Sequence, residues 1–84
     1  MLNYTAIRNF FDNNPEGYIN IVQSDCVFKL TSDIGFSLDE TSITLMGIYY
    51  TDKNCGNTYN RKGNFMIPFN QILRVEYIKK YIET

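Results

Sequence analysis

The spacing of hydrophobic residues predicts that the chain begins with a short helix. Four apolar residues recur at helical spacing and so share one helical face: Tyr4, Ile7, Phe10 and Phe11. Asn3 or Thr5 can supply the side-chain oxygen that caps the first turn. Residues 13–17, NNPEG, end the helix, because proline disfavours helical backbone at the preceding residue and glycine permits a turn. So short a helix is marginal in isolation, and we expect it to pack on the rest of the chain.

After residue 17 the apolar positions alternate with polar ones, which is typical of β-strands. Extended segments are predicted at residues 18–23, 26–31, 36–38, 42–50, 65–69 and 72–78. Segment 42–50, SITLMGIYY, is apolar on both faces, and Gly47 within it indicates a bulge, a sharp bend or a close backbone approach. For residues 72–82 a helix is the alternative, but their apolar positions scatter around a helical wheel, which favours a strand.

These elements predict an α+β, β-rich fold in a single domain over residues 1–84. We expect one short N-terminal helix packed on a small curled antiparallel sheet, or on a partly open barrel, of five to six strands. The run FMIPF, the short break NQ and the run ILRVEYI, at residues 65–78, resemble the last two strands of small Sm-like or SH3-like barrels. Bacterial pleckstrin-type barrels end their strands in a similar way.

The composition excludes several kinds of chemistry. With 44% hydrophobic and 20% charged residues, the 84-residue chain has the balance of a folded domain rather than of a disordered one. The sequence has no histidine, which removes Ser–His and Cys–His catalytic pairs and the commonest transition-metal ligand. The net charge of −1 argues against binding driven by phosphate neutralisation. We therefore expect a protein that is not an enzyme and holds no cofactor or metal.

The sequence also suggests a cellular setting. The start, MLNYTAIRNFF, lacks the features of a secretory signal, and no apolar run approaches the roughly 18 residues that cross a bilayer. The expectation is a cytoplasmic protein that does not bind membranes and keeps Cys26 and Cys55 as thiols. Phe, Tyr, Met, Ile, Asn and Lys, which have AT-rich codons, are abundant, which points to a low-GC bacterium or to a phage or other mobile element.

Residues 51–64, TDKNCGNTYNRKGN, are predicted to form a long polar loop that holds the candidate binding residues. These are Lys53, Asn57, Tyr59, Arg61 and Lys62, together with the flanking Tyr49 and Tyr50. Arginine can grip phosphate, glycine lets backbone N–H groups approach an anion, and tyrosine offers a stacking face or a rigid interface side chain. Three interpretations stay open: a plain solvated hairpin loop, a protein-binding loop, and a contact for a nucleotide or for nucleic acid.

Other charged groups have simpler interpretations. Asp33 and the pair Asp39-Glu40 form the one carboxylate cluster, and such acids in turns are mostly solvated rather than catalytic or bound to Mg²⁺. Arg74 with Lys79 and Lys80 can form a basic strip, or can protect an exposed sheet edge from other strands.

The leading functional hypothesis is a small non-catalytic interaction protein that binds a protein partner. An inhibitor or antagonist of a host enzyme or defence complex, encoded by a mobile element, would fit its size and composition. The alternative is a small β-barrel of the Sm-like or SH3-like type that binds nucleic acid or a nucleotide. A homodimer is a further expectation, because residues 42–50 are apolar on both faces and a small sheet gains by pairing.

Overall fold

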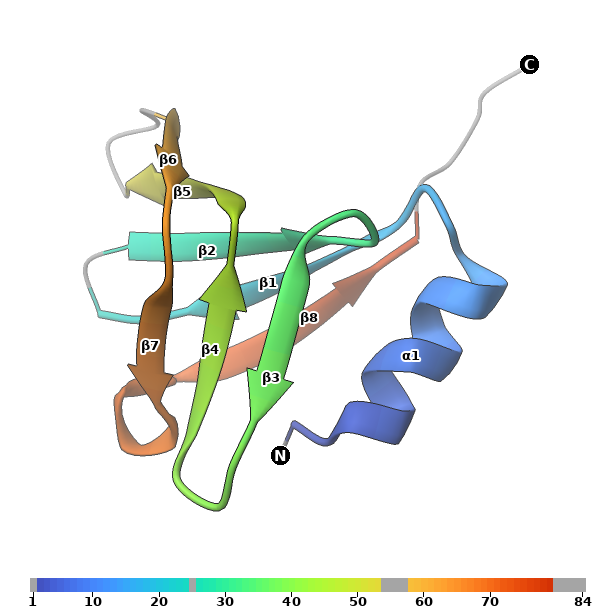
Figure 1. Cartoon of the computed structure of the whole chain (residues 1–84), viewed down its shortest axis with the longest axis horizontal. Coiled ribbons are helices and arrows are strands. Elements are labelled where there is room, and N and C mark those ends of the chain that lie inside the picture. Colours follow the sequence, from blue (N-terminus) through green and yellow to red (C-terminus); the bar gives the residue numbers. More distant parts are fainter. Residues whose placement is uncertain (1, 25, 54–57, 80–84) are drawn as a thin grey trace.

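The computed structural model describes residues 2–24, 26–53 and 58–79, and it describes side chains for residues 2–24, 26–47 and 63–79. Along the chain the elements are α1 (Tyr4–Asn13), β1 (Tyr18–Val22), β2 (Cys26–Thr31), β3 (Gly35–Leu38), β4 (Ser42–Met46), β5 (Ile48–Lys53), β6 (Thr58–Lys62), β7 (Phe65–Pro68), the 3₁₀ turn η1 (Phe69–Gln71) and β8 (Arg74–Ile78). Figure 1 shows α1 on one side of the strands.

The strands form two antiparallel sheets. The larger sheet has the order β6-β5-β2-β1-β8, and the smaller has the order β3-β4-β7. The predicted fold class, α+β and β-rich with one N-terminal helix on a small antiparallel sheet, is confirmed. The described part of the chain contains eight strands rather than five or six, because the predicted segment 42–50 divides at Gly47 into β4 and β5 and because residues 58–62 form β6.

A pair of glycines lies where the chain passes from one sheet to the other. Gly47 separates β4 from β5, and Gly63 lies opposite it between β6 and β7. The Gly47 N–H donates to the Gly63 carbonyl at 3.1 Å, and the Gly63 N–H donates to the Gly47 carbonyl at 2.8 Å. Both have positive φ, at 92° and 118°, a region in which side chains are strained. The bend predicted at Gly47 is therefore present, and one hairpin spans both sheets (Figure 1).

The long polar loop predicted over residues 51–64 is wrong for most of its length. Residues 51–53 continue β5 and residues 58–62 form β6, which pairs with β5 from Ile48↔Lys62 to Asp52↔Thr58. The segment is polar throughout, so no alternation marked it as a strand. Backbone pairing between the two arms of the hairpin, which does not depend on side-chain polarity, decides the structure.

The last predicted strand is confirmed as a strand over Arg74–Ile78, and the helical alternative is wrong there. The sheet explains this result, because β8 pairs with β1 from Tyr18↔Ile78 to Val22↔Arg74. The preceding break at NQ lies in η1 (Phe69–Gln71). Residues 80–82, the end of the segment predicted as strand or helix, lie outside the described residues.

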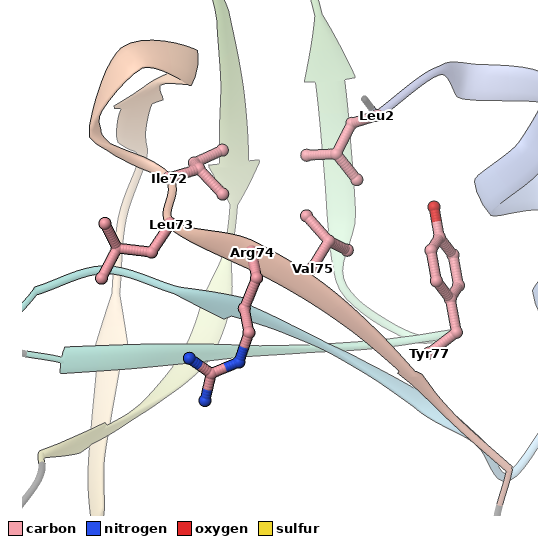
Figure 2. Close-up of a pocket in the computed structure, with 6 residues that line it drawn as sticks. All are labelled: Leu2, Ile72, Leu73, Arg74, Val75 and Tyr77. Atoms are coloured by element: carbon pink, nitrogen blue, oxygen red, sulfur yellow. The ribbon is translucent and has the colours of Figure 1, made fainter.

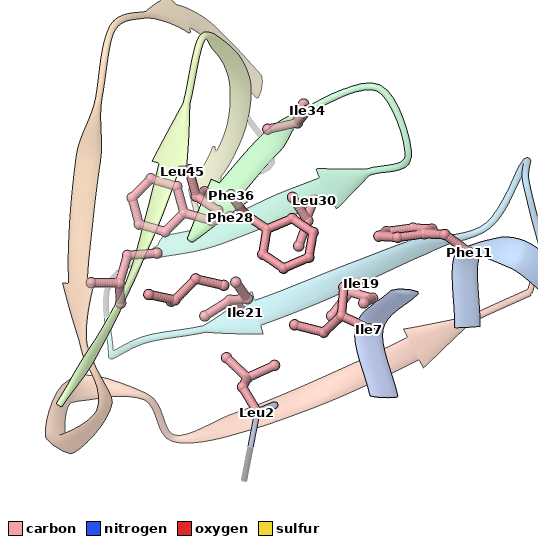
Figure 3. Close-up of a cluster of buried hydrophobic side chains, with 12 residues drawn as sticks. Leu2, Ile7, Phe11, Ile19, Ile21, Phe28, Leu30, Ile34, Phe36 and Leu45 are labelled. Atoms are coloured by element: carbon pink, nitrogen blue, oxygen red, sulfur yellow. The ribbon is translucent and has the colours of Figure 1, made fainter. Parts of the chain in front are cut away.

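The core lies between the two sheets and is closed on one side by α1 (Figure 3). Alternate residues of the strands point inward, as in β1, where Ile19 and Ile21 are fully buried. Among the residues whose side chains are described, the buried cluster draws on α1, β1, β2, β3, β4 and β7 and on the segments beside them: Leu2, Ile7, Phe11, Ile19, Ile21, Phe28, Leu30, Ile34, Phe36, Ile43, Leu45 and Ile67. The predicted packing of the helix on the sheet is thus confirmed.

Helix α1 is fixed at both of its ends. Asn3 is the N-cap, and its side-chain oxygen accepts a hydrogen bond from the Ala6 N–H at 2.7 Å. Near the start of α1 the Tyr4 ring lies 5.2 Å from the ring of Phe36 on β3, and near its end Phe10 lies 5.3 Å from Tyr77 on β8. The helix therefore contacts both sheets through aromatic pairs.

Candidate binding surface

Six of the seven candidate binding residues lie on two paired strands: Tyr49, Tyr50 and Lys53 on β5, and Tyr59, Arg61 and Lys62 on β6. In register, Tyr49 lies opposite Arg61, and Tyr50 lies between Asn60 and Lys29 of β2. Tyr59 pairs with Thr51, Lys62 with Ile48, and Lys53 with Cys26. Asn57 is outside the described residues, as are the side chains of residues 48–62. The backbone thus brings Tyr49 and Arg61 together, and the binding role of these residues stays a prediction.

The described part of the chain contains a different candidate, a groove along β8. The β8 groove has a volume of about 330 Å³ and is lined by Leu2, Ile72, Leu73, Arg74, Val75 and Tyr77 (Figure 2). Leu73 is 65% exposed and Tyr77 is 43% exposed, although both are large and hydrophobic. β8 ends the strand order of the larger sheet, so the groove runs beside a sheet edge.

The two charged side chains of β8 form an ion pair with each other. The Arg74 Nε–H donates to Glu76 Oε2 at 2.9 Å, and the Asn20 side chain on β1 donates to Glu76 Oε1 at 3.3 Å. The hydrogen bonds from Arg74 and then from Asn20 hold the pKa of Glu76 below its ordinary value. Glu76 is therefore ionised at neutral pH and balances the charge of Arg74. Figure 2 shows Arg74 pointing to the opposite side of β8 from Val75 and Tyr77.

Four of the six side chains that line the groove are aliphatic, those of Leu2, Ile72, Leu73 and Val75. Apart from Arg74, its only ionisable side chain is Tyr77, and burial raises the pKa of that phenol, so the ring stays neutral. One wall depends on α1, because Phe10 packs edge-on against Tyr77 with ring centroids 5.3 Å apart. The arrangement can therefore take up apolar side chains, whereas it offers little to a phosphate.

A second groove of about 330 Å³ lies at the end of the smaller sheet, beside the turn at Asp39. Its apolar lining comes from Met66, which is 60% exposed, and from Pro68 and Phe69. Asp39 accepts hydrogen bonds from the backbone N–H groups of Thr41 at 2.7 Å and Ser42 at 2.8 Å, and these lower its pKa. The Asp39 carboxylate thus shapes a turn, in agreement with the structural interpretation of this acid.

The described residues hold no cluster of three or more side chains with metal-ligand chemistry. Asp33 accepts a hydrogen bond from the Thr31 hydroxyl, and the Cys26 thiol donates to the Gln23 side-chain oxygen at 3.1 Å. Cys55 lies outside the described residues, so the redox state expected for the two cysteines stays a prediction.

Sequence reasoning did not select the β8 groove. The strand predicted at residues 72–78 places Leu73, Val75 and Tyr77 on one face, and alternation alone does not indicate that Leu73 is 65% exposed and Tyr77 43% exposed. The available signal was the adjacent apolar pair Ile72-Leu73 directly after a predicted turn. One of two neighbouring strand residues has to face away from the core, so such a pair indicates an apolar group at the surface.

Among the helices that the structure describes, none has the length and apolar character required to traverse a lipid bilayer. No protein-family model, curated protein or solved structure matches the chain.

Proposed function

We propose that this chain is a non-catalytic interaction protein that binds a protein partner through the β8 groove. The observation that carries the proposal is the exposure of two large hydrophobic side chains that line one groove, Leu73 at 65% and Tyr77 at 43%. Large side chains of this kind cost free energy while they stay in water, and a partner that covers them recovers it. Tyrosine is also enriched among the residues that dominate binding energy.

Charge favours a protein partner over nucleic acid at this groove. Its one cation, Arg74, is already paired with Glu76 at 2.9 Å, and the whole chain carries a net charge of −1. Phosphate binding draws its energy from unpaired Lys and Arg groups. An inhibitor or antagonist of a host enzyme or defence complex, carried by a phage or other mobile element, is the setting that we propose for this activity, on the grounds of size and composition.

A capture experiment tests the groove with a matched pair of variants. Leu73→Ser removes an apolar side chain from the groove, and Met66→Ser removes one that is 60% exposed on the other sheet. The protein is immobilised and incubated with a lysate of the source organism, and captured proteins are identified by mass spectrometry. We expect a protein captured by the wild type and by Met66→Ser and lost with Leu73→Ser. Equal capture by both variants would exclude the groove.

A small barrel that binds nucleic acid is the alternative, and the resemblance of residues 65–78 and the basic pair Arg61-Lys62 support it. Charge reversal of Arg61 and Lys62, or Tyr59→Ala, tests whether these residues bind nucleic acid. If they do, the variants should bind single-stranded RNA more weakly than the wild type, while the melting temperature of the protein stays nearly constant. Such binding would also fall steeply between low and physiological salt, whereas capture of a protein by the groove would respond weakly. Salt-insensitive capture would favour the protein partner.

A further inference from the structure

We propose that the occupant of the β8 groove is an extended peptide segment of the partner, which adds a strand to the edge of β8. This inference rests on the proposed function and specifies how the partner is recognised. We propose a strand rather than a helix or a second folded surface because the groove lies beside the outer edge of β8. Only an extended segment can form successive hydrogen bonds with the backbone N–H and C=O groups of such an edge.

The first support is the position of β8. Within the described residues β8 pairs with β1 alone, from Tyr18↔Ile78 to Val22↔Arg74, and it ends the sheet order. In an antiparallel pair, alternate residues direct their N–H and C=O groups toward the neighbour, and the rest direct them outward. The outward groups of an edge strand are a template for another chain.

The second support is a comparison with the edges of the smaller sheet. On β7 the edge carries Pro68, which lacks an N–H and protects an edge against pairing. On β3 the ring of Phe36 packs against Tyr4 of α1 at 5.2 Å. β8 shares this kind of aromatic contact, since Tyr77 packs against Phe10 of α1 at 5.3 Å, but it carries no proline over Arg74–Ile78, so every residue of this edge keeps its N–H.

The third support is the direction of the charges on β8. Charged side chains commonly protect edge strands, which is one interpretation of Arg74. Here Glu76 accepts hydrogen bonds from Arg74 and from Asn20 of the neighbouring strand β1, so the two charges are paired with each other. Arg74 also lines the groove, but it points to the opposite side of β8 from Val75 and Tyr77 (Figure 2). The two charges leave the apolar side of the edge, with Val75 and Tyr77, unprotected.

These features define the chemistry of the segment. Side chains of a strand alternate between two faces, so every second residue of the peptide enters the β8 groove beside Val75 and Tyr77 and has to be apolar. The intervening residues lie on the face of Arg74 and Glu76, where polar or charged side chains fit. The expected motif is therefore an alternating apolar–polar run about as long as β8.

The test uses random peptides of about twelve residues, displayed on phage and selected on the whole protein. Selected peptides are remade with a single N-methyl group at each backbone position in turn. Methylation at alternate positions, where the N–H would pair with β8, is expected to weaken binding about tenfold or more. Methylation at the intervening positions is expected to change the affinity less than about twofold, as is Met66→Ser in the protein.

The outcomes separate the two levels of the proposal. Two results would overturn the added strand while leaving the groove as the site. In both, peptide binding is lost with Leu73→Ser, but either the selected peptides carry apolar residues at helical spacing, or no N-methyl group weakens their binding. Dimerisation that is lost with Leu73→Ser identifies a second copy as the occupant and also overturns the peptide. If every selected peptide binds Leu73→Ser as tightly as it binds the wild type, both the added strand and the groove are excluded as the binding site. Because Leu73 is 65% exposed, this variant is expected to fold, which circular dichroism checks.

Discussion

Replacement of Gly47 by alanine is expected to destabilise the fold through backbone strain alone. Gly47 has a φ of 92°, in a region that L-residues rarely adopt, yet nothing lies within 4 Å of the Cβ that alanine would add. The same holds for Gly63, with a φ of 118°. Holding a side-chain residue in such a conformation costs about 1–3 kcal/mol. Each substitution should lower the free energy of unfolding by that amount.

The size of this effect is large for so short a chain. A domain of 84 residues is stable by about 4–12 kcal/mol, and a loss of 1 kcal/mol lowers the melting temperature of such a domain by about 4–8 °C. Gly35→Ala is the matched control, because the added Cβ would lie 3.6 Å from Met46 in ordinary contact and Gly35 has no positive φ. Its effect should stay within about 1 kcal/mol in either direction.

Urea unfolding followed by circular dichroism measures the three variants beside the wild type. The midpoints of Gly47→Ala and Gly63→Ala should fall clearly below that of Gly35→Ala, with similar slopes. If Gly47→Ala and Gly35→Ala unfold at the same urea concentration, the hairpin does not bend at the glycine pair, and the arrangement of the two sheets described above is refuted.

Three further predictions concern the helix, the core and the turn at Asp39. Asn3→Ala removes the acceptor of the Ala6 N–H and should cost about 1 kcal/mol in urea unfolding; no change would mean that the cap is not formed. Ile19→Ala, at a fully buried site, should cost about 2–5 kcal/mol by the same measurement, and a smaller loss would contradict its place in the core. The pKa of Asp39 is held below its ordinary value of 3.8 by hydrogen bonds from Thr41 and Ser42, so its contribution to stability is present above that value and is lost as the pH falls through the lowered folded pKa. Unfolding midpoints measured from pH 7 down to this acid range should therefore fall less steeply in Asp39→Ala than in the wild type, and parallel profiles would contradict the turn.

The sequence was sufficient to predict the elements in which the spacing of apolar side chains indicates the buried face. The helix and the alternating strands around Ile19 follow from residue spacing. Backbone preferences narrowed the cap to Asn3 or Thr5 and marked Gly47 as a bulge, a bend or a close approach, and the structure shows the cap at Asn3 and the bend at Gly47. The strand over Arg74–Ile78 was also recognisable, since its apolar residues do not share one helical face.

Two features could not be predicted because they depend on tertiary neighbours. Residues 58–62 form β6 although they are polar, since β5 supplies the pairing that their own pattern does not indicate. The β8 groove depends on which side of an alternating strand is covered, and α1 covers Tyr77 only in part while leaving Leu73 exposed. The alternation of apolar and polar residues in one strand does not indicate how much of that strand the neighbouring elements cover.

The position of the N-terminal segment has a practical consequence for work with this protein. Leu2 lines the β8 groove, and Phe10 supports the Tyr77 ring that forms one of its walls. A tag, anchor or fluorescent protein fused to the N-terminus would therefore begin at the rim of the β8 groove. There it could obstruct the binding that it is meant to detect. A label attached at an exposed site on the smaller sheet, for instance Met66→Cys, would leave that rim open.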